Sequence, residues 1–204
     1  MVNSGRTWNF AGSGPRNTPT VRGAGQTLPL HWSADRDEFQ DFEFSIRQLQ
    51  AGTGLIVGRD PNPPLGPPNA GLSADLDALA AFCISLLPKP SPLVSPRASI
   101  ERGAAIFQRA DTGCATCHIP PRYTDSSLTP APFIKHDVGT GNSASEQNGS
   151  SFDTPSLRML WDTAPYLHDG SAPSLQDVFT HQHGNTSQLS TTEVQDLVAY
   201  LLSL

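Results

Sequence analysis

Two stretches of this 204-residue chain resemble each other closely enough to constrain its fold. The segment NTPTVRGAGQTLPLHWSADRDEFQDF (17–42) aligns without gaps with DTPSLRMLWDTAPYLHDGSAPSLQDV (153–178), at an offset of 153 − 17 = 136 residues. Further along, ADLDALAAFCISL (74–86) aligns with TEVQDLVAYLLSL (192–204), at an offset of 192 − 74 = 118 residues. Because the same elements recur in the same order, we expect one supersecondary plan to occur twice.

The second copy, unlike the first, follows a C-x-x-C-H motif, GCATCHIP, with Cys114, Cys117 and His118. In c-type haem attachment both thiols become thioethers and the adjacent imidazole becomes the proximal iron ligand. A four-ligand zinc site would need a second Cys/His pair, and the remaining cysteine, Cys83, sits alone in an apolar run. A redox dithiol would be expected in a βαβ context after a strand, whereas the preceding segment has a helical pattern. The motif therefore favours covalent haem over zinc or a dithiol.

The motif and the repeat together predict two units. The first copy has no C-x-x-C-H motif before it and carries 136 − 118 = 18 extra residues, which include the proline-rich RDPNPPLGPPNAG. We expect residues 1–90 to form an incomplete cytochrome-like unit, because the sequence begins partway through that unit. Residues 91–204 are expected to form a complete haem domain. On this interpretation the chain is a portion of a longer protein.

Helical patterns flank the motif. Ser95 can cap a helix that begins at Pro96 and presents one apolar stripe; this stripe consists of Ile100, Gly103, Ala104 and Phe107. Ser190 and Glu193 form a capping-box signature before a C-terminal helix. An equivalent face in the first copy predicts that Cys83 is a small buried hydrophobe. Residues 118–151 lack a sustained period and predict a long surface loop.

Charge and hydropathy exclude two classes of partner. The net charge is −6 and the pI is near 5.4, with no basic stripe, which argues against nucleic acid. The sequence contains no run of eighteen apolar residues that could span a membrane. The N-terminus has no apolar core typical of a secretion signal. Since thioether attachment of haem normally takes place outside the cytoplasm, we expect a periplasmic or other extracytoplasmic location, with the signal removed or upstream.

The combination of helix, C-x-x-C-H, loop, TPSLR, PYLHDGSAPSLQDV and a helix ending in LVAYLLSL resembles the haem domain of the di-haem cytochrome c peroxidase superfamily. That superfamily includes methylamine-utilisation relatives and cytochromes fused to β-propellers. The resemblance covers residues 95–204 well and residues 15–87 more weakly. It implies an all-α cytochrome c fold, usually in tandem, with one covalent haem c here. The missing partner is then a redox protein or an N-terminal haem or propeller domain.

The sixth iron ligand is the open chemical question, because a strong ligand gives an electron carrier and an open site can bind peroxide or oxygen. The main candidates are His183, His181, Met159 and His168, and His136 and His31 are less favoured candidates. The resemblance favours His183, then His181, because relatives carry a methionine ligand about a dozen residues beyond HDG. Met159 lies 159 − 118 = 41 residues beyond His118, an acceptable loop length for a methionine ligand.

Two further residues are expected near the haem. The resemblance implies that His168, in PYLHDG, lies beside the haem without binding the iron; the aligned residue of the first copy is Trp32, which cannot bind iron. Arg158 recurs as Arg22, and its guanidinium can pair with a haem propionate or tie loop carbonyls together. His136 is expected to order its own loop, and Asp169 to accept a hydrogen bond from a backbone amide or His168.

Two functions from different classes follow. The first is single-electron transfer through a haem held by Cys114, Cys117 and His118. The alternative is a peroxidase-like or oxygen-activating domain that works with a second haem missing from this chain. Because the sequence offers no convincing acid/base pair beside the iron, electron transfer is favoured and no catalytic residue is assigned.

Overall fold

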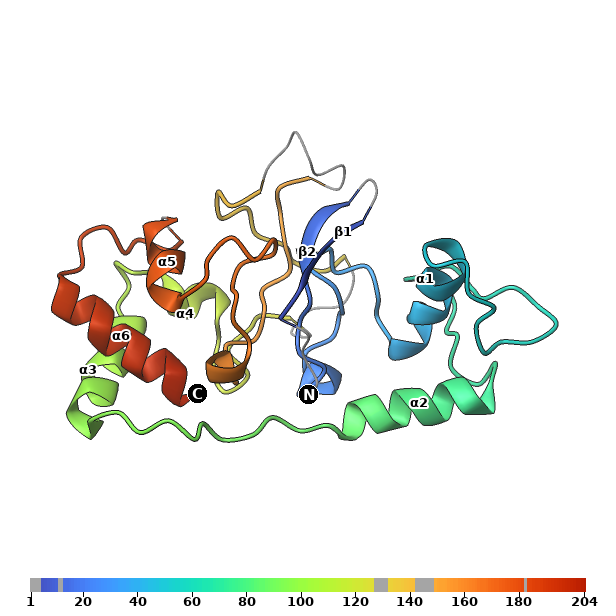
Figure 1. The fold of residues 1–204 in the computed structure, drawn as a ribbon, viewed down its shortest axis with the longest axis horizontal. Coiled ribbons are helices and arrows are strands. Elements are labelled where there is room, and N and C mark those ends of the chain that lie inside the picture. The colour runs from blue at the N-terminus through green and yellow to red at the C-terminus, as the bar shows by residue number, and fades with distance from the viewer. Residues whose placement is uncertain (1–4, 11–12, 127–131, 142–148, 182) are drawn as a thin grey trace.

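The computed structural model describes residues 5–10, 13–126, 132–141, 149–181 and 183–204. In these ranges the fold is mostly helical. A small hairpin lies near the middle of the molecule, with α1 and α2 on one side and α3, α4, α5 and α6 on the other (Figure 1). The elements in chain order are β1 (Thr7–Phe10), β2 (Gly14–Asn17), the 3-10 helices η1 (Ala24–Gln26) and η2 (Phe39–Asp41), α1 (Phe42–Gln48), α2 (Ala74–Ser85), α3 (Arg97–Phe107), α4 (Cys114–Cys117), the 3-10 helix η3 (Leu160–Asp162), α5 (Leu175–Thr180) and α6 (Thr191–Ser203).

The hairpin corrects the all-α prediction. Strands β1 and β2 pair in antiparallel register, with Thr7 opposite Asn17. Only the four residues of β1, TWNF, alternate between polar and apolar side chains, and β2 reads GPRN, so the local pattern is too short to predict a hairpin. Contacts with the second half of the chain hold it. The Asn17 N–H donates to the His168 carbonyl at 2.6 Å, and the Thr7 hydroxyl donates to the Asp169 carbonyl at 3.1 Å. Such long-range contacts override local propensity.

Helices α3 and α6 pack against each other and form the centre of the core. The capping box at the start of α6 is present as predicted: the Ser190 hydroxyl accepts from the Glu193 N–H, and the Glu193 carboxylate accepts from the Ser190 N–H. Helix α3 begins one residue later than predicted, with Pro96 as its N-cap and no side-chain cap from Ser95. Arg102 on α3 donates from Nε and Nη2 to the two carboxylate oxygens of Asp196 on α6, at 2.5 and 2.8 Å.

The two copies found in the sequence have the same local structure. Helix η1 and helix η3 occupy equivalent positions, 160 − 24 = 136 residues apart. An isolated antiparallel bridge between Leu30 and Arg36 has its counterpart between Tyr166 and Ala172, again at 166 − 30 = 136. The repeat is therefore a repeat of backbone geometry as well as of sequence.

Helix α2 is the counterpart of α6, but one of its apolar faces is exposed. Leu76 and Ala80 are buried, whereas Leu79 and Phe82 are 48% and 61% exposed. Cys83 is half-buried rather than buried, which corrects the prediction of a core cysteine. The physical reason is that, among the described residues, no helix covers this face in the way that α3 covers α6.

Replacing Gly103 with alanine tests the α3–α6 crossing. A Cβ at this position would lie 2.0 Å from the Asp196 carbonyl oxygen and 2.7 Å from the Tyr200 Cβ, so a helix must move. We expect Gly103→Ala to lower the free energy of unfolding by about 1–3 kcal/mol in chemical denaturation. An alanine in an open helical position would instead raise it by roughly 0.5–1 kcal/mol. The exposed control Glu101→Ala should change it by less than about 0.5 kcal/mol, and a stabilised Gly103→Ala variant would contradict the close crossing.

Candidate functional site

The two thiols of the motif lie on α4, a single helical turn that starts after a left-handed glycine. Gly113 has φ 71°, a conformation that glycine adopts without steric cost, and it turns the chain from the end of α3 into α4. The His118 N–H donates to the Cys114 carbonyl at 3.0 Å. Cys114 and Cys117 are half-buried, and burial raises the pKa of the Cys114 thiol. All three motif residues line one cavity.

The imidazole of His118 is buried and oriented by a backbone hydrogen bond. Its Nδ1 lies 3.1 Å from the carbonyl oxygen of Tyr123, so Nδ1 carries the proton and Nε2 keeps its lone pair. Burial, with a smaller contribution from nearby His183, lowers the pKa of His118 to about 4. The ring is therefore neutral at pH 7, which is the form that can bind a metal.

The cavity has a volume of about 330 Å³ and is mostly apolar. Its wall comes from both copies of the repeat. The first copy contributes Pro29, Leu30 and Trp32, and the second contributes the side chains of Phe107, Leu157, Leu160, Val178, Leu197 and Leu201. An apolar cavity with a few convergent polar groups is typical of a cofactor site.

His183 lies in the same cavity as His118. The centroids of the two rings are 6.1 Å apart. The Nδ1 of His183 is buried and makes no hydrogen bond within the described part of the chain. Burial also lowers the pKa of His183, which keeps this imidazole neutral as well. Two neutral imidazoles with free lone pairs thus face the cavity from different segments.

The other candidates for the sixth position lie elsewhere. His181 is exposed and does not line the cavity. Met159 is 1% exposed but also lies outside the cavity lining, and its sulfur accepts the backbone N–H of Lys89 at 3.2 Å. Met159 aligns with Gly23, and both residues have a positive φ before a 3-10 helix. The Met159 sulfur therefore contacts the Lys89 backbone and does not line the cavity that contains His118.

Arg158 and His168 both line the cavity. The Arg158 guanidinium donates to the side-chain oxygen of Gln26 at 2.8 Å. His168 is 2% exposed, with its ring stacked on Phe152 at a centroid distance of 4.0 Å. The His168 ring also lies nearly perpendicular to that of Trp32, with a centroid distance of 6.4 Å. His168 is thus a buried wall residue.

His31 and Asp169, two further residues considered in the sequence, make local contacts. His31 lines the cavity, and its Nδ1 pairs with the Asp35 carboxylate at 2.8 Å. The Asp169 carboxylate accepts the backbone N–H of Ser171 at 3.0 Å, as expected.

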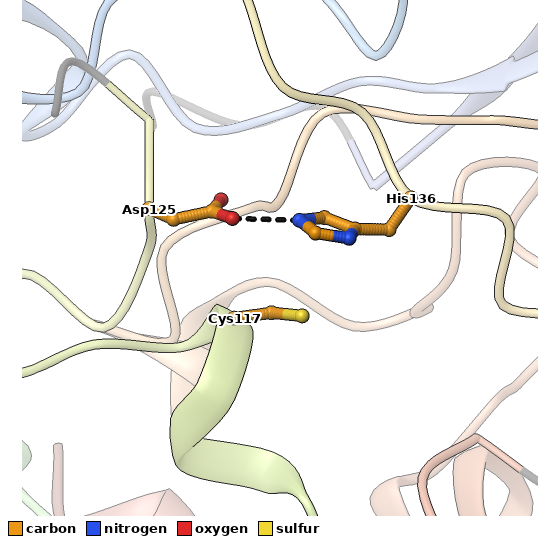
Figure 2. Close-up of side chains that lie close together, drawn as sticks. All are labelled: Cys117, Asp125 and His136. Carbon is orange, nitrogen blue, oxygen red and sulfur yellow. Dashed lines mark hydrogen bonds and ion pairs between the residues drawn. The ribbon is translucent and has the colours of Figure 1, made fainter. Parts of the chain in front are cut away.

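A cluster of three potential metal ligands lies beside the motif, and the sequence does not predict it. Cys117, Asp125 and His136 each offer a ligand atom, and these atoms lie within 4.8 Å of one another (Figure 2). The His136 Nε2 is 2.6 Å from the Asp125 Oδ2. His136 therefore orders its own loop, as expected, because it pairs with a carboxylate of the same loop, and this pair lies next to a motif cysteine.

Asp153 adds a second buried carboxylate near this cluster. It lines the cavity, and its Oδ1 accepts the Ser126 hydroxyl at 2.7 Å. Desolvation, with a smaller contribution from the charge of Asp125, raises the pKa of Asp153 to about 7. Part of this site is therefore protonated at neutral pH.

Known proteins resemble this chain in sequence. The family model described as "RoxA-like, cytochrome c-like" matches residues 151–186. The hydrazine synthase subunit gamma of Kuenenia stuttgartiensis is 27% identical, with 98% of this chain and 68% of the relative covered. The methylamine utilization protein MauG of Methylophilus methylotrophus is 27% identical, with 94% and 68% covered. The cytochrome-c peroxidase IdrP2 of Pseudomonas sp. (strain SCT) is 32% identical over 51% of this chain and 39% of its own length.

A solved structure shares the fold. It is a MauG-like protein associated with microbial copper homeostasis, 18% identical in sequence, with a TM-score of 0.65. The match covers 98% of this chain and 79% of that protein. Among the described residues, we find no helix with both the length and the hydropathy required to cross a membrane.

The titration of Asp153 gives a testable pH dependence. Its pKa is about 7 in the folded chain, against an ordinary value of 3.8, so the folded state binds the proton more tightly. The group therefore stabilises the fold at low pH, and this contribution is lost as the pH rises from about 4 to about 7. We expect Asp153→Asn to gain stability relative to the unmodified chain over this range, measured by chemical unfolding. The exposed control Asp137→Asn should show no such gain above pH 5, and parallel curves for Asp153→Asn would contradict the burial of this carboxyl.

Proposed function

We propose that this chain binds one haem c and transfers single electrons. The proposal rests on the chain's membership of the di-haem cytochrome c peroxidase superfamily. Cys114 and Cys117 would tether the porphyrin as thioethers, and His118 would bind the iron through Nε2. The observation that carries the proposal is the neutral His118 in an apolar cavity, with both thiols in the same wall. When bound, haem iron supplies one-electron exchange.

The residues around the cavity would orient the iron ligand, exclude water and hold the haem propionates. The Tyr123 carbonyl fixes the tautomer of His118 and prevents the ring from turning. The apolar wall excludes water, which lowers the reorganisation that each electron transfer requires. Arg158 lines the cavity and can offer charge-assisted hydrogen bonds to a propionate.

We infer that His183 is the sixth ligand. Two imidazoles that held one metal ion from opposite sides at about 2 Å each would have ring centroids roughly 6 Å apart, and the observed separation is 6.1 Å. The buried, unbonded Nδ1 of His183 also costs free energy unless a ligand compensates for it. His181 and Met159 have neither feature. A closed sixth position favours an electron carrier over the peroxidase-like alternative.

We further propose the division into an incomplete unit, residues 1–90, and a haem domain, residues 91–204. Leu79 and Phe82, exposed on α2, align with Leu197 and Tyr200, which are buried on α6 against α3 (197 − 79 = 118). Because α2 is equivalent to α6, we propose that a helix outside the described residues covers the exposed face of α2, as α3 covers α6. That helix could belong to an N-terminal haem or propeller domain or to a redox partner. Covalent haem attachment also supports an extracytoplasmic location.

Covalent attachment is tested by expressing the chain with cytochrome maturation machinery. We expect the haem to stay with the protein in a denaturing gel, because thioether bonds survive denaturation. Cys117→Ala should weaken or abolish retention, and the matched control Cys83→Ala should not. Release of all haem from the unmodified protein into acidified organic solvent would refute the assignment.

The sixth ligand is tested on three variants of the haem-loaded protein. We expect His183→Gly to open the iron, so that the reduced protein binds carbon monoxide at least tenfold faster. His181→Gly and Met159→Ala should leave the rate nearly unchanged, because both side chains lie outside the cavity lining. If Met159→Ala alone opens the iron, His183 is not the ligand, although an electron-transfer role survives.

A further inference from the structure

Three side chains beside the haem-attachment motif have the chemistry of a transition-metal site. Cys117 supplies a sulfur, Asp125 a carboxylate oxygen and His136 an imidazole nitrogen, all within 4.8 Å of one another (Figure 2). Thiolate, imidazole and carboxylate are the ligands of Zn²⁺, which is bound in a tetrahedron. Three protein ligands would leave the fourth position to water.

The positions of these ligands are fixed by the fold. His136 exchanges two backbone hydrogen bonds with Phe152, at 2.8 and 2.9 Å, so its backbone is anchored. Cys117 is the last residue of α4, whose direction Gly113 determines. The ligands therefore come from two anchored segments and the loop that carries Asp125, and only small side-chain shifts would bring them to tetrahedral distances.

A second, independent observation points to a cation. The Asp125 side chain is 9% exposed, and its Oδ1 makes no hydrogen bond within the described residues. Its other oxygen pairs with His136 at 2.6 Å. A buried carboxylate oxygen without a donor is costly, and a metal ion beside it would remove the cost.

We propose that the chain, before haem attachment, binds one zinc-type divalent ion through Cys117, Asp125 and His136. The Cys117 thiol loses its proton to solvent when the metal–sulfur bond forms, while Asp125 binds as a carboxylate and His136 as a neutral imidazole. Zinc binding and thioether formation at Cys117 then exclude each other, so the ion would protect this thiol until haem is attached. The site itself does not depend on the electron-transfer role.

The test uses the full haem-free chain with reduced thiols, titrated with Zn²⁺ alone against a chromophoric chelator. We expect one zinc ion per chain and no competition from Mg²⁺ or Ca²⁺, which prefer all-oxygen sites. His136→Ala, Asp125→Asn and Cys117→Ser should each raise the Kd at least tenfold. The matched control Cys114→Ser should leave it unchanged, because the Cys114 sulfur lies against the Thr112 carbonyl at 3.8 Å instead.

A second measurement tests directly whether zinc binds the Cys117 thiol. Zinc should slow alkylation of Cys117 by iodoacetamide more than alkylation of Cys114, as determined by mass spectrometry. Failure of the haem-free chain to bind Zn²⁺ overturns the proposal. Equal losses of affinity in Cys114→Ser and Cys117→Ser, with none in His136→Ala, also overturn it, because the C-x-x-C-H motif alone would then hold the ion.

Discussion

The hydrogen bond between His118 Nδ1 and the Tyr123 carbonyl is the interaction on which the rest of the site depends. It selects the tautomer whose Nε2 is free to bind iron. Tyr123 is itself held by the helix pair: its hydroxyl meets that of Tyr200 on α6 at 3.0 Å, and its ring packs edge-on against Phe107 on α3 at 5.9 Å. The α3–α6 crossing therefore sets the orientation of an imidazole that neither helix carries.

The first half of the chain has no C-x-x-C-H motif but still forms part of the cavity wall. Trp32 and His168 occupy equivalent positions in the two copies, and their rings meet edge to face. The Trp32 indole N–H donates to the Asn17 carbonyl, and the Trp32 carbonyl accepts the Asp153 N–H, at 2.9 and 2.8 Å. Through these contacts the two copies of the repeat face each other across one apolar cavity, and neither encloses it alone.

The sequence predicted the features of the fold that depend on neighbouring residues, such as helix starts and the repeated backbone segments. The capping box at Ser190 predicted the start of α6, and gap-free alignment predicted the shared backbone of the repeats. The sequence did not predict the hairpin, which Asn17 and other long-range contacts hold, or the approach of Asp125 to Cys117 and His136. The loop that contains Asp125 and His136 has no periodicity, so the proximity of these two residues to Cys117 depends on tertiary packing. The contact between the Met159 sulfur and the Lys89 backbone is likewise not encoded in the spacing.

The central proposal is that two neutral imidazoles, His118 and His183, would both bind the iron of a haem c held in this cavity. Electron paramagnetic resonance of the unmodified, haem-loaded ferric protein tests it most directly, together with its optical spectrum. The account predicts a low-spin ferric signal without the charge-transfer band of a methionine–iron bond. A high-spin signal, with rapid reaction of the resting protein with peroxide, would contradict it and favour the peroxidase-like function.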